Sequence, residues 1–438
     1  MNVTVAPGAL AGSVRAPSSK SEAHRLLMCA ALADGTTDLD CTTSSADIDA
    51  TARCLAALGA GVARTRLGWR VRGLPRDASG RPQARPGALL DCGESGSTLR
   101  FLLPVAAALG AGATMEGQGR LPERPLSPLY EELEAHGAVL GPQGRLPLSV
   151  AGRLRAGTFE LPGNISSQYV TGLLLAAPVL REPVRIVVER PVESRPYVDL
   201  TAEALGRFGV GVTVAPAATA SGAPALAWEA SAQHGCRTPG AVAVGGDWSN
   251  AAFWLAAGAL GGAPVEVTGL DPASAQGDRA FLAMLAALGA QVGRARTGAG
   301  AHGGSLRGRE VDVSACPDLV PPLAAVAAVA EGTTRITGAA RLRLKESDRL
   351  ATVSAAINSL GGEVEELPDG LLVRGRARLA GGTVDAANDH RIAMMAAVLA
   401  ARCERPVTIV GAECVAKSYP AFFEDLAALG GTCTKEGI

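Results

Sequence analysis

The sequence predicts an α/β protein made of six similar units that close into two domains. With 438 residues, the chain is too long for one ordinary core. A glycine that ends a helix-like stretch recurs six times along it. Between these glycines, a polar cluster repeatedly opens an apolar stretch that leads into a strand rich in Val, Ile and Thr.

The recurring glycine is the first element of the repeat. It stands at Gly59, Gly137, Gly209, Gly289, Gly361 and Gly430, at intervals of 69 to 80 residues. Glycine adopts the left-handed conformation that closes a helix without steric cost. Each of the six is therefore expected to end an outer helix, with a strand directly after it.

The second element is a helix that is apolar nearly all round, which places it inside a domain. Its six copies begin near Ser21, Ser95, Ser166, Asp247, Asp318 and Asp389. Each unit of about 70 residues should thus hold one buried helix, one outer helix and strands between them. Three units plus three give two pseudo-symmetric domains. A solenoid is the alternative, but solenoid repeats are usually shorter than about 50 residues.

Composition narrows the class of partner. The 41 basic and 42 acidic residues leave a formal charge of −1, so no overall field favours nucleic acid or an anionic membrane. Nine scattered cysteines without a C-x-x-C spacing favour a reduced compartment. No signal-like start and no apolar run of about 18 residues is evident, so a cytoplasmic location is expected.

Polar clusters at the expected helix starts are candidate anion sites, because the first turn of a helix presents unpaired N–H groups. The clusters are 17–25, 92–100, 166–169, 344–349 and 388–391. Each alone is equally explained as a helix cap or a solvated turn. Arg124 and Lys417 alone read as surface charge. The clusters occupy equivalent positions in the repeats, which favours a shared role in anion binding. Cations at a helix start also need an anion to offset the helix dipole.

Other reaction chemistries find no support in the motifs. No Ser-His-Asp order, metal-ligand spacing, Walker loop or G-x-G-x-x-G is evident. His24, His136, His234 and His302 are interpreted as structural or surface residues. Catalysis is therefore expected to rest on carboxylates, lysines and arginines, without a metal.

These motifs, in this order, resemble the 5-enolpyruvylshikimate-3-phosphate synthase family of enolpyruvyl transferases nearly end to end. The resemblance lies in Lys20-Ser21 with Arg25, the 93–100 loop, Glu123-Arg124-Pro125, Ser166-Ser167-Gln168, Ser194-Arg195-Pro196-Tyr197, Pro317-Asp318, 345–349, Asp389-His390-Arg391 and Lys417.

The resemblance implies two inverse α/β domains, each of three βαβαββ-like repeats, with the ligand cleft between them. One domain would comprise 1–17 and 243–438, and the inserted one 18–242. The implied reaction moves the carboxyvinyl group of phosphoenolpyruvate to the 5-hydroxyl of shikimate 3-phosphate. Phosphate leaves through a tetrahedral ketal, on the route to chorismate and aromatic amino acids. No cofactor is implied, and a monomer is expected.

The resemblance also assigns site residues. Phosphoenolpyruvate would be held by Lys20, Gly96, Arg124, Gln168, Arg349, Arg391 and Lys417. Shikimate 3-phosphate would be held by Lys20, Ser21, Arg25, Ser166, Ser167, Gln168, Ser194, Tyr197, Asp318 and Lys345. Asp318 is expected to be the base for the hydroxyl, Glu346 to shuttle the methyl proton, and Lys20 to stabilise or protonate the phosphate-bearing oxygen.

Three positions depart from the family pattern: Glu94 replaces a frequent Asn, Phe101 a common Pro and Arg341 an Asn. Contacts at 94 and 341 therefore stay open, whereas the retained Gly96 predicts competitive inhibition by glyphosate.

Two alternative functions remain. A UDP-N-acetylglucosamine carboxyvinyltransferase shares this architecture, but that family carries a Cys near the Arg124 segment, and residues 117–128 contain none. A non-enzymatic repeat protein that binds anionic partners would not need Asp318 and Glu346.

Overall fold

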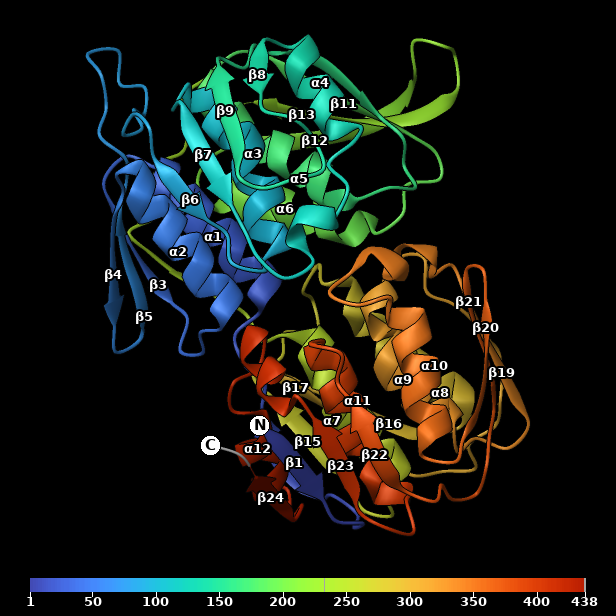
Figure 1. The fold of residues 1–438 in the computed structure, drawn as a ribbon. Helices are drawn as coiled ribbons and strands as arrows, with labels where there is room; N and C mark the ends of the chain where they lie inside the picture. The colour runs from blue at the N-terminus through green and yellow to red at the C-terminus, as the bar shows by residue number, and fades with distance from the viewer. Residues whose placement is uncertain (232, 437–438) are drawn as a thin grey trace. The chain divides into compact units, whose positions relative to one another are not determined.

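A computed structural model describes residues 1–231 and 233–436. The chain divides into two compact units (Figure 1). The terminal unit comprises Met1–Pro17 and Gly245–Ile438, and the inserted unit comprises Ser18–Val244. The predicted domains, 1–17 with 243–438 and 18–242, place the second crossing of the chain two residues earlier.

The described residues of the inserted unit form three four-stranded sheets, ordered β14-β3-β5-β4, β6-β7-β9-β8 and β10-β11-β13-β12. In each sheet the first two strands are parallel and the other pairs antiparallel. The strands are β3 (Thr36–Asp40), β4 (Gly61–Thr65), β5 (Gly68–Arg72), β6 (Leu89–Asp91), β7 (Ala113–Glu116), β8 (Ala138–Leu140), β9 (Leu148–Gly152), β10 (Gly157–Leu161), β11 (Val184–Glu189), β12 (Gly211–Ala218), β13 (Pro224–Ser231) and β14 (Ala241–Ala243).

Three helices of this unit are buried almost completely, and three bury one side only. The buried helices are α1 (Lys20–Leu32), α3 (Gly96–Leu109) and α5 (Ser167–Leu180). The outer helices are α2 (Ala46–Leu58), α4 (Leu129–Ala135) and α6 (Arg195–Arg207). A short 3-10 turn, η1 (Leu121–Glu123), precedes Arg124. Helix α3 packs against α5, and α1 against α2, α5 and α6, around one apolar core.

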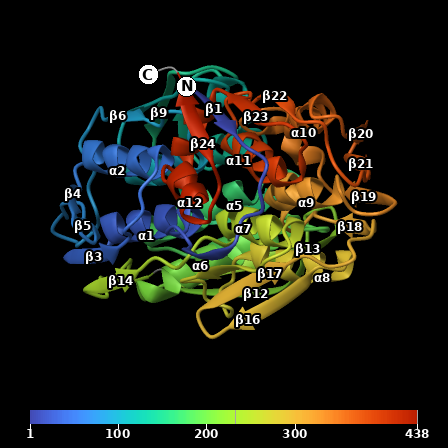
Figure 2. The ribbon, with the colours of Figure 1, turned by 90° about the horizontal axis from the view of Figure 1, so that it is seen from below.

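The terminal unit repeats this plan with sheets ordered β16-β17-β15-β2, β18-β19-β21-β20 and β22-β23-β1-β24. Its strands are β1 (Asn2–Val5), β2 (Gly12–Arg15), β15 (Val265–Thr268), β16 (Gln291–Ala295), β17 (Gly298–His302), β18 (Glu310–Asp312), β19 (Thr333–Thr337), β20 (Glu363–Leu367), β21 (Gly370–Arg374), β22 (Gly382–Asp385), β23 (Val407–Val410) and β24 (Cys433–Glu436). Strand β1, at the N-terminal end of the chain, lies between β23 and β24, which come from its C-terminal end (Figure 2).

The buried helices of the terminal unit are α7 (Trp248–Leu260), α9 (Val320–Ala327) and α11 (His390–Leu399). The outer helices are α8 (Phe281–Leu288), α10 (Arg349–Ser359) and α12 (Phe422–Ala428). The 3-10 turns are η2 (Gly277–Ala280), η3 (Pro317–Leu319), η4 (Ala340–Leu344), η5 (Ala400–Arg402) and η6 (Ala412–Lys417).

On either side of the two crossings between the units, strands pair with distant parts of the chain inside their own unit. β1 and β2 complete sheets of the terminal unit, and β14, just before the second crossing, pairs in parallel with β3 of the inserted unit. The element order β6-α3-β7-α4-β8-β9 is one uninterrupted βαβαββ repeat. The predicted α/β architecture of six repeats, three in each of the two compact units, is confirmed.

The predicted helix ends and starts are also found. All six recurring glycines have positive φ, between 79° and 110°, at the ends of α2, α4, α6, α8, α10 and α12. Five of the six buried helices begin where a polar cluster was expected, whereas Asp318 lies inside the 3-10 turn that leads into α9. Within the described residues, no helix is long and apolar enough to cross a membrane.

Candidate active site

Polar clusters at five of the six buried helix starts supply a side-chain cap, whereas α9 begins without one. Ser95 accepts the N–H of Thr98 at 3.2 Å, and Ser166 accepts that of Gln168 at 3.3 Å. In the terminal unit, Asp389 accepts the N–H of Arg391 at 3.0 Å. The capping interpretation of these clusters is therefore correct. It does not exclude ligand binding, because a cap satisfies only part of the four unpaired N–H groups of a helix start.

Arg124 lies directly over the start of α3 in the inserted unit. A Cβ built on Gly96 would be 2.5 Å from Nη1 and 2.8 Å from Nη2 of Arg124. The Arg124 residue is 9 % exposed, and its Nε is buried without a hydrogen-bond partner among the described residues. The surface-charge interpretation is therefore wrong for Arg124. A buried cation that lacks a carboxylate, next to a helix start, is a ready site for an anion.

Gln168, at the start of α5, is fixed from α3. Its Oε1 accepts a hydrogen bond from Nη1 of Arg100 at 2.9 Å, and its Nε2 donates to Ser97 at 3.0 Å. Nη2 of Arg100 donates to the backbone oxygen of Pro125 at 2.9 Å. Arg100 was given no role in the sequence interpretation. A buried arginine inside an apolar helix was the signal that could have identified it.

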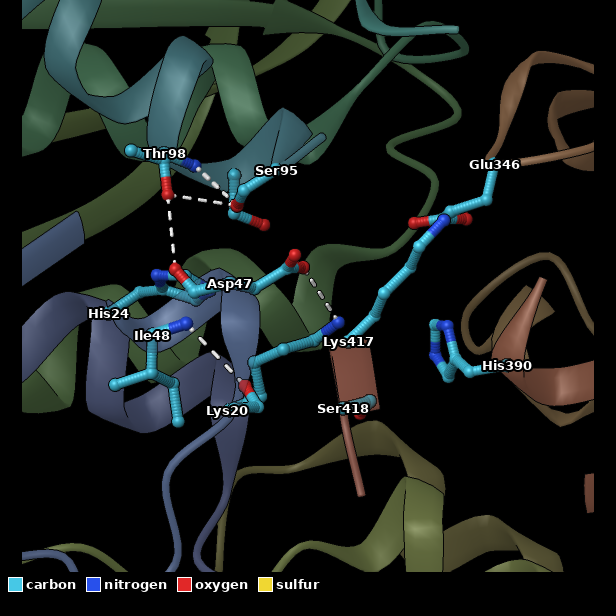
Figure 3. Close-up of polar contacts among 12 residues, drawn as sticks. Lys20, His24, Asp47, Ile48, Ser95, Thr98, Glu346, His390, Lys417 and Ser418 are labelled. Carbon is cyan, nitrogen blue, oxygen red and sulfur yellow. Dashed lines mark hydrogen bonds and ion pairs between the residues drawn. The ribbon is translucent and has the colours of Figure 1, made fainter. Parts of the chain in front are cut away.

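Lys20, the first residue of α1, forms an ion pair with Asp47 of α2 at 3.0 Å (Figure 3). Both side chains are largely buried, at 15 % and 13 % exposed. Asp47 was not among the predicted site residues. It lies 27 residues from Lys20, and nothing in its local sequence distinguishes it from an ordinary acidic residue in the first turn of a helix.

Arg25 is a buried cation whose donors are mostly in use. Its guanidinium donates to Thr201 at 2.9 Å, to Thr171 at 3.3 Å and to the backbone oxygens of Ser21 and Tyr197. Burial lowers the pKa of Arg25 to about 10. Four of the five guanidinium N–H groups are thus engaged, so one is left for the expected ring carboxylate unless this network rearranges.

The remaining predicted residues of the inserted unit gather at the same helix starts. Ser167 is the first residue of α5, and Ser166 is its cap. Ser194, with φ of 53°, precedes α6, and its backbone oxygen accepts the N–H of Tyr197 at 3.1 Å. Because Arg25 contacts Thr171 of α5 and Tyr197 of α6, these positions form one connected region.

Arg349 is the centre of the terminal unit's cluster. It is 1 % exposed and donates to three carboxylates, those of Asp389, Asp318 and Glu346. The distances are 2.8 Å, 2.9 Å and 2.6 Å respectively. Burial opposes the charge of Arg349, but these carboxylates raise its pKa above the ordinary value. An external anion was expected to offset this cation at a helix start; the protein's own carboxylates do so instead.

Asp318 faces three cations. Arg349, Arg391 and Lys345 lie 2.9 Å, 3.3 Å and 3.5 Å from its carboxylate oxygens. Burial alone would raise the pKa of Asp318, but Lys345, Arg391 and Arg349 outweigh it and hold this pKa well below the ordinary value. A carboxylate in this state is ionised but is a weak proton acceptor.

Arg391 and Lys417 complete the terminal group. Arg391 donates to Ser249 at 3.0 Å and to the backbone oxygen of Asp318 at 3.3 Å. Nζ of Lys417 donates to the backbone oxygen of Asn388 at 2.7 Å. Arg341, whose contacts the sequence left undecided, donates to the backbone oxygen of Ser314 at 2.9 Å. Within this unit, five predicted residues converge on one cluster: Asp318, Lys345, Glu346, Arg349 and Arg391.

Comparison with known proteins gives one consistent family. The family model described as EPSP synthase (3-phosphoshikimate 1-carboxyvinyltransferase) matches residues 5–426. A 3-phosphoshikimate 1-carboxyvinyltransferase of Clostridium kluyveri is 40 % identical over 432 residues, which cover 98 % of this chain and 97 % of that protein. One from Halobacterium salinarum is 41 % identical over 441 residues, with 98 % and 99 % covered.

Solved structures agree on the fold. The EPSP synthase of Acinetobacter baumannii superposes with a TM-score of 0.79 at 25 % identity, with 100 % of both chains covered. The enolpyruvyl transferase NikO of Streptomyces tendae superposes with a TM-score of 0.73 at 18 % identity, with 99 % of this chain and 98 % of that one covered. The expected family resemblance is confirmed: this chain belongs to the EPSP synthase (3-phosphoshikimate 1-carboxyvinyltransferase) family.

Proposed function

We propose that this chain transfers the carboxyvinyl group of phosphoenolpyruvate to the 5-hydroxyl of shikimate 3-phosphate and releases phosphate. Its family membership supports this reaction over transfer to UDP-N-acetylglucosamine. The observation within the site that carries the proposal is the buried guanidinium of Arg124 over Gly96. The site has a cation and a helix start in place for an anion, and no carboxylate of the described residues occupies it.

Phosphoenolpyruvate carries two anionic groups, and we assign each to a set of cations. Its phosphate is assigned to Lys20, the Gly96 amide, Arg124, Gln168 and Lys417. Its carboxylate is assigned to Arg349 and Arg391, because guanidinium groups bind carboxylates in a bidentate manner. The carboxylate of the substrate would then replace Asp318 and Glu346 on Arg349, while the buried Asp389 stays in place.

Shikimate 3-phosphate is assigned mainly to the starts of α1, α5 and α6. Its phosphate is assigned to Ser166, Ser167 and Ser194, with Tyr197 beside them. Its ring carboxylate is assigned to Ser21 and Arg25, and its ring hydroxyls to Lys345. Neutral hydroxyls suit a phosphate that must be bound and released intact, because they donate hydrogen bonds without adding fixed charge.

The proposed chemistry uses Asp318 and Glu346 as separate proton carriers. The 5-hydroxyl loses its proton to Asp318 and attacks the central carbon, while the methylene carbon gains a proton from Glu346, giving the tetrahedral ketal. Glu346 then removes a methyl proton as phosphate leaves, and Lys20 stabilises the phosphate-bearing oxygen. Displacement of Asp318 from Arg349 by the substrate removes a cation from it, which would raise its pKa and make it a better base.

A phosphate-release assay with phosphoenolpyruvate tests the proposed function. Shikimate 3-phosphate should support release, whereas UDP-N-acetylglucosamine should not. Glu346→Gln tests the assigned role separately, because it should slow the exchange of the methylene protons of phosphoenolpyruvate with solvent. Normal exchange in this variant would refute the role of Glu346 and leave the overall reaction intact.

The oligomeric state and location follow as part of the same proposal. The two compact units are assigned as the two domains that bring both anion-binding groups to the substrates. We assign the protein as a monomer, because both groups of site residues lie on one chain, and as cytoplasmic, because its scattered cysteines favour a reduced compartment. Sedimentation in the presence and absence of both substrates tests this assignment, and a stable dimer would contradict it.

A further inference from the structure

A chain of buried polar side chains runs through the apolar core of the inserted unit to the start of α3. Nδ1 of His24 lies 2.7 Å from the hydroxyl of Thr51, which lies 2.7 Å from the hydroxyl of Thr98. The Thr98 hydroxyl donates to Oγ of Ser95 at 2.8 Å. All four residues are 1 % exposed. Figure 3 shows the last contact, with His24, Thr98 and Ser95 beside Lys20 and Asp47.

The direction of these hydrogen bonds follows from counting hydrogens. Each hydroxyl has one hydrogen to donate. That of Thr98 is used on Oγ of Ser95 at 2.8 Å, which is much closer than the backbone oxygen of Asp47 at 3.5 Å, and therefore points away from Thr51. Thr51 must then donate to Thr98, which leaves Thr51 only an acceptor toward His24. The imidazole must therefore carry its proton on Nδ1.

The surroundings of His24 agree with this tautomer. Burial, followed by the charges of Lys20 and Arg25, holds the pKa of His24 well below its ordinary value, so the ring is neutral. Nε2 is buried without a hydrogen-bond partner among the described residues, and Phe101 lies edge-on to the ring. A second proton on Nε2 would be a buried donor with no acceptor, which is costly.

The chain of bonds also fixes the hydroxyl of Ser95. Its oxygen accepts from both the N–H and the hydroxyl of Thr98, at 3.2 Å and 2.8 Å. Both lone pairs are then occupied, so the single hydrogen of Ser95 is available only to another acceptor. Ser95 directly precedes Gly96, over which the guanidinium of Arg124 lies.

We propose that His24, Thr51 and Thr98 are positioning residues that set Ser95 as a hydrogen-bond donor to the anion held at Gly96 and Arg124. The inference rests on the proposed function, in which that anion is the phosphate of phosphoenolpyruvate. A purely structural role explains the chain less well, because buried hydroxyl pairs contribute little net stability compared with apolar residues of the same shape.

Nitrogen-15 NMR of labelled histidine tests the direction of the hydrogen bonds from His24 to Ser95 in the unmodified protein. The His24 signals should show a neutral ring protonated on Nδ1, unchanged between about pH 6 and pH 9, across the range where an ordinary histidine titrates. A ring protonated on Nε2, or one that titrates in this range, would overturn the proposal whatever the enzyme's activity.

Substitution tests the effect on the anion. Thr98→Val should raise the KM for phosphoenolpyruvate and the Kd for inorganic phosphate about tenfold, the loss expected for one hydrogen bond to a charged group. The kcat should change much less. Thr37→Val is the matched control, because Thr37 is also fully buried and bonded to another threonine hydroxyl, that of Thr238, but in β3.

Two substitutions of His24 distinguish a positioning role from a packing role. His24→Asn keeps a donor near the place of Nδ1 and should retain most phosphate affinity, whereas His24→Leu should lose it as Thr98→Val does. Unchanged phosphate affinity in Thr98→Val, or equal losses in Thr98→Val and Thr37→Val, would overturn the proposal. Failure of the unmodified enzyme to use phosphoenolpyruvate would refute the proposed function instead, since the NMR and phosphate-binding results do not need turnover.

Discussion

Asp389 holds Arg349 through both of its carboxylate oxygens while it caps the helix that follows it. The oxygens accept from Nε and Nη2 of Arg349 at 2.8 Å and 3.2 Å, and one also accepts the N–H of Arg391 at 3.0 Å. Ser347 donates to the same carboxylate at 3.0 Å. A single fully buried side chain thus joins the starts of α10 and α11 and holds Nε and Nη2 of the guanidinium, while Nη1 donates to Asp318.

Asp389→Ala should lower the free energy of unfolding by about 3 kcal/mol, because it removes one partner of a buried ion pair and a helix cap. Urea unfolding measures the change. Asp348→Ala is the matched control, since Asp348 caps α10 but its side chain is 37 % exposed. The control should cost about 1 kcal/mol. Equal losses in the two variants would show that the bond to Arg349 contributes nothing beyond the cap.

The stability contributed by Asp318 should depend on pH. Three cations hold its folded pKa below the ordinary value of about 3.9, so its contribution is present above that pH and fades as the pH falls toward the folded pKa. The difference in unfolding free energy between the unmodified protein and Asp318→Asn should be constant above about pH 5 and shrink below about pH 4. A difference that grows on acidification would contradict this assignment.

Gly96→Ala should displace Arg124, because the added Cβ would lie 2.5 Å from Nη1 and 2.7 Å from Cζ. We expect the KM for phosphoenolpyruvate to rise at least about tenfold, the effect of a weakened bond to a charged group. Steady-state kinetics measures it. Gly206→Ala in α6 is the control, since nothing lies within 4 Å of its Cβ. A normal KM in Gly96→Ala would remove Gly96 from the phosphate site.

Glyphosate should inhibit competitively with phosphoenolpyruvate, because it presents a phosphonate and a carboxylate to the same cations. Arg124→Met should therefore raise the inhibition constant and the KM for phosphoenolpyruvate in parallel, each by more than about tenfold. Inhibition kinetics at several phosphoenolpyruvate concentrations makes the comparison. Noncompetitive inhibition, or a change in only one of the two constants, would show that the two molecules do not share Arg124.

Local signals in the sequence were enough to predict most helix ends. A glycine after a helix and a serine or aspartate before one act through backbone geometry within a few residues, so their positions predict helix ends directly. The helix start at Asp318 was less well predicted because Pro317 begins a 3-10 turn there. The pairing of β1, β2 and β14 with their partner strands joins residues far apart in the sequence, which no local pattern encodes.

The residues of the candidate site were proposed from the sequence, but the contacts that they make with other side chains of the protein were not. Asp389 stood inside a recognised motif, yet its bond to Arg349 spans 40 residues. The contact of Thr51 with Thr98 spans 47 residues, and both are ordinary threonines in sequence. Such contacts arise only when helices pack side by side. The sequence therefore predicted which charged residues form the site, and the packing determines which of them neutralise one another.

Phosphorus-31 NMR of the enzyme with phosphoenolpyruvate and shikimate 3-phosphate tests the central claim most directly. We expect the phosphoenolpyruvate signal to decline while inorganic phosphate and the shifted phosphate ester of carboxyvinylated shikimate 3-phosphate grow in equal amounts. Replacing the acceptor with UDP-N-acetylglucosamine should leave phosphoenolpyruvate unchanged. Consumption of phosphoenolpyruvate with the UDP-sugar, or inorganic phosphate formed without a new ester, would contradict the account.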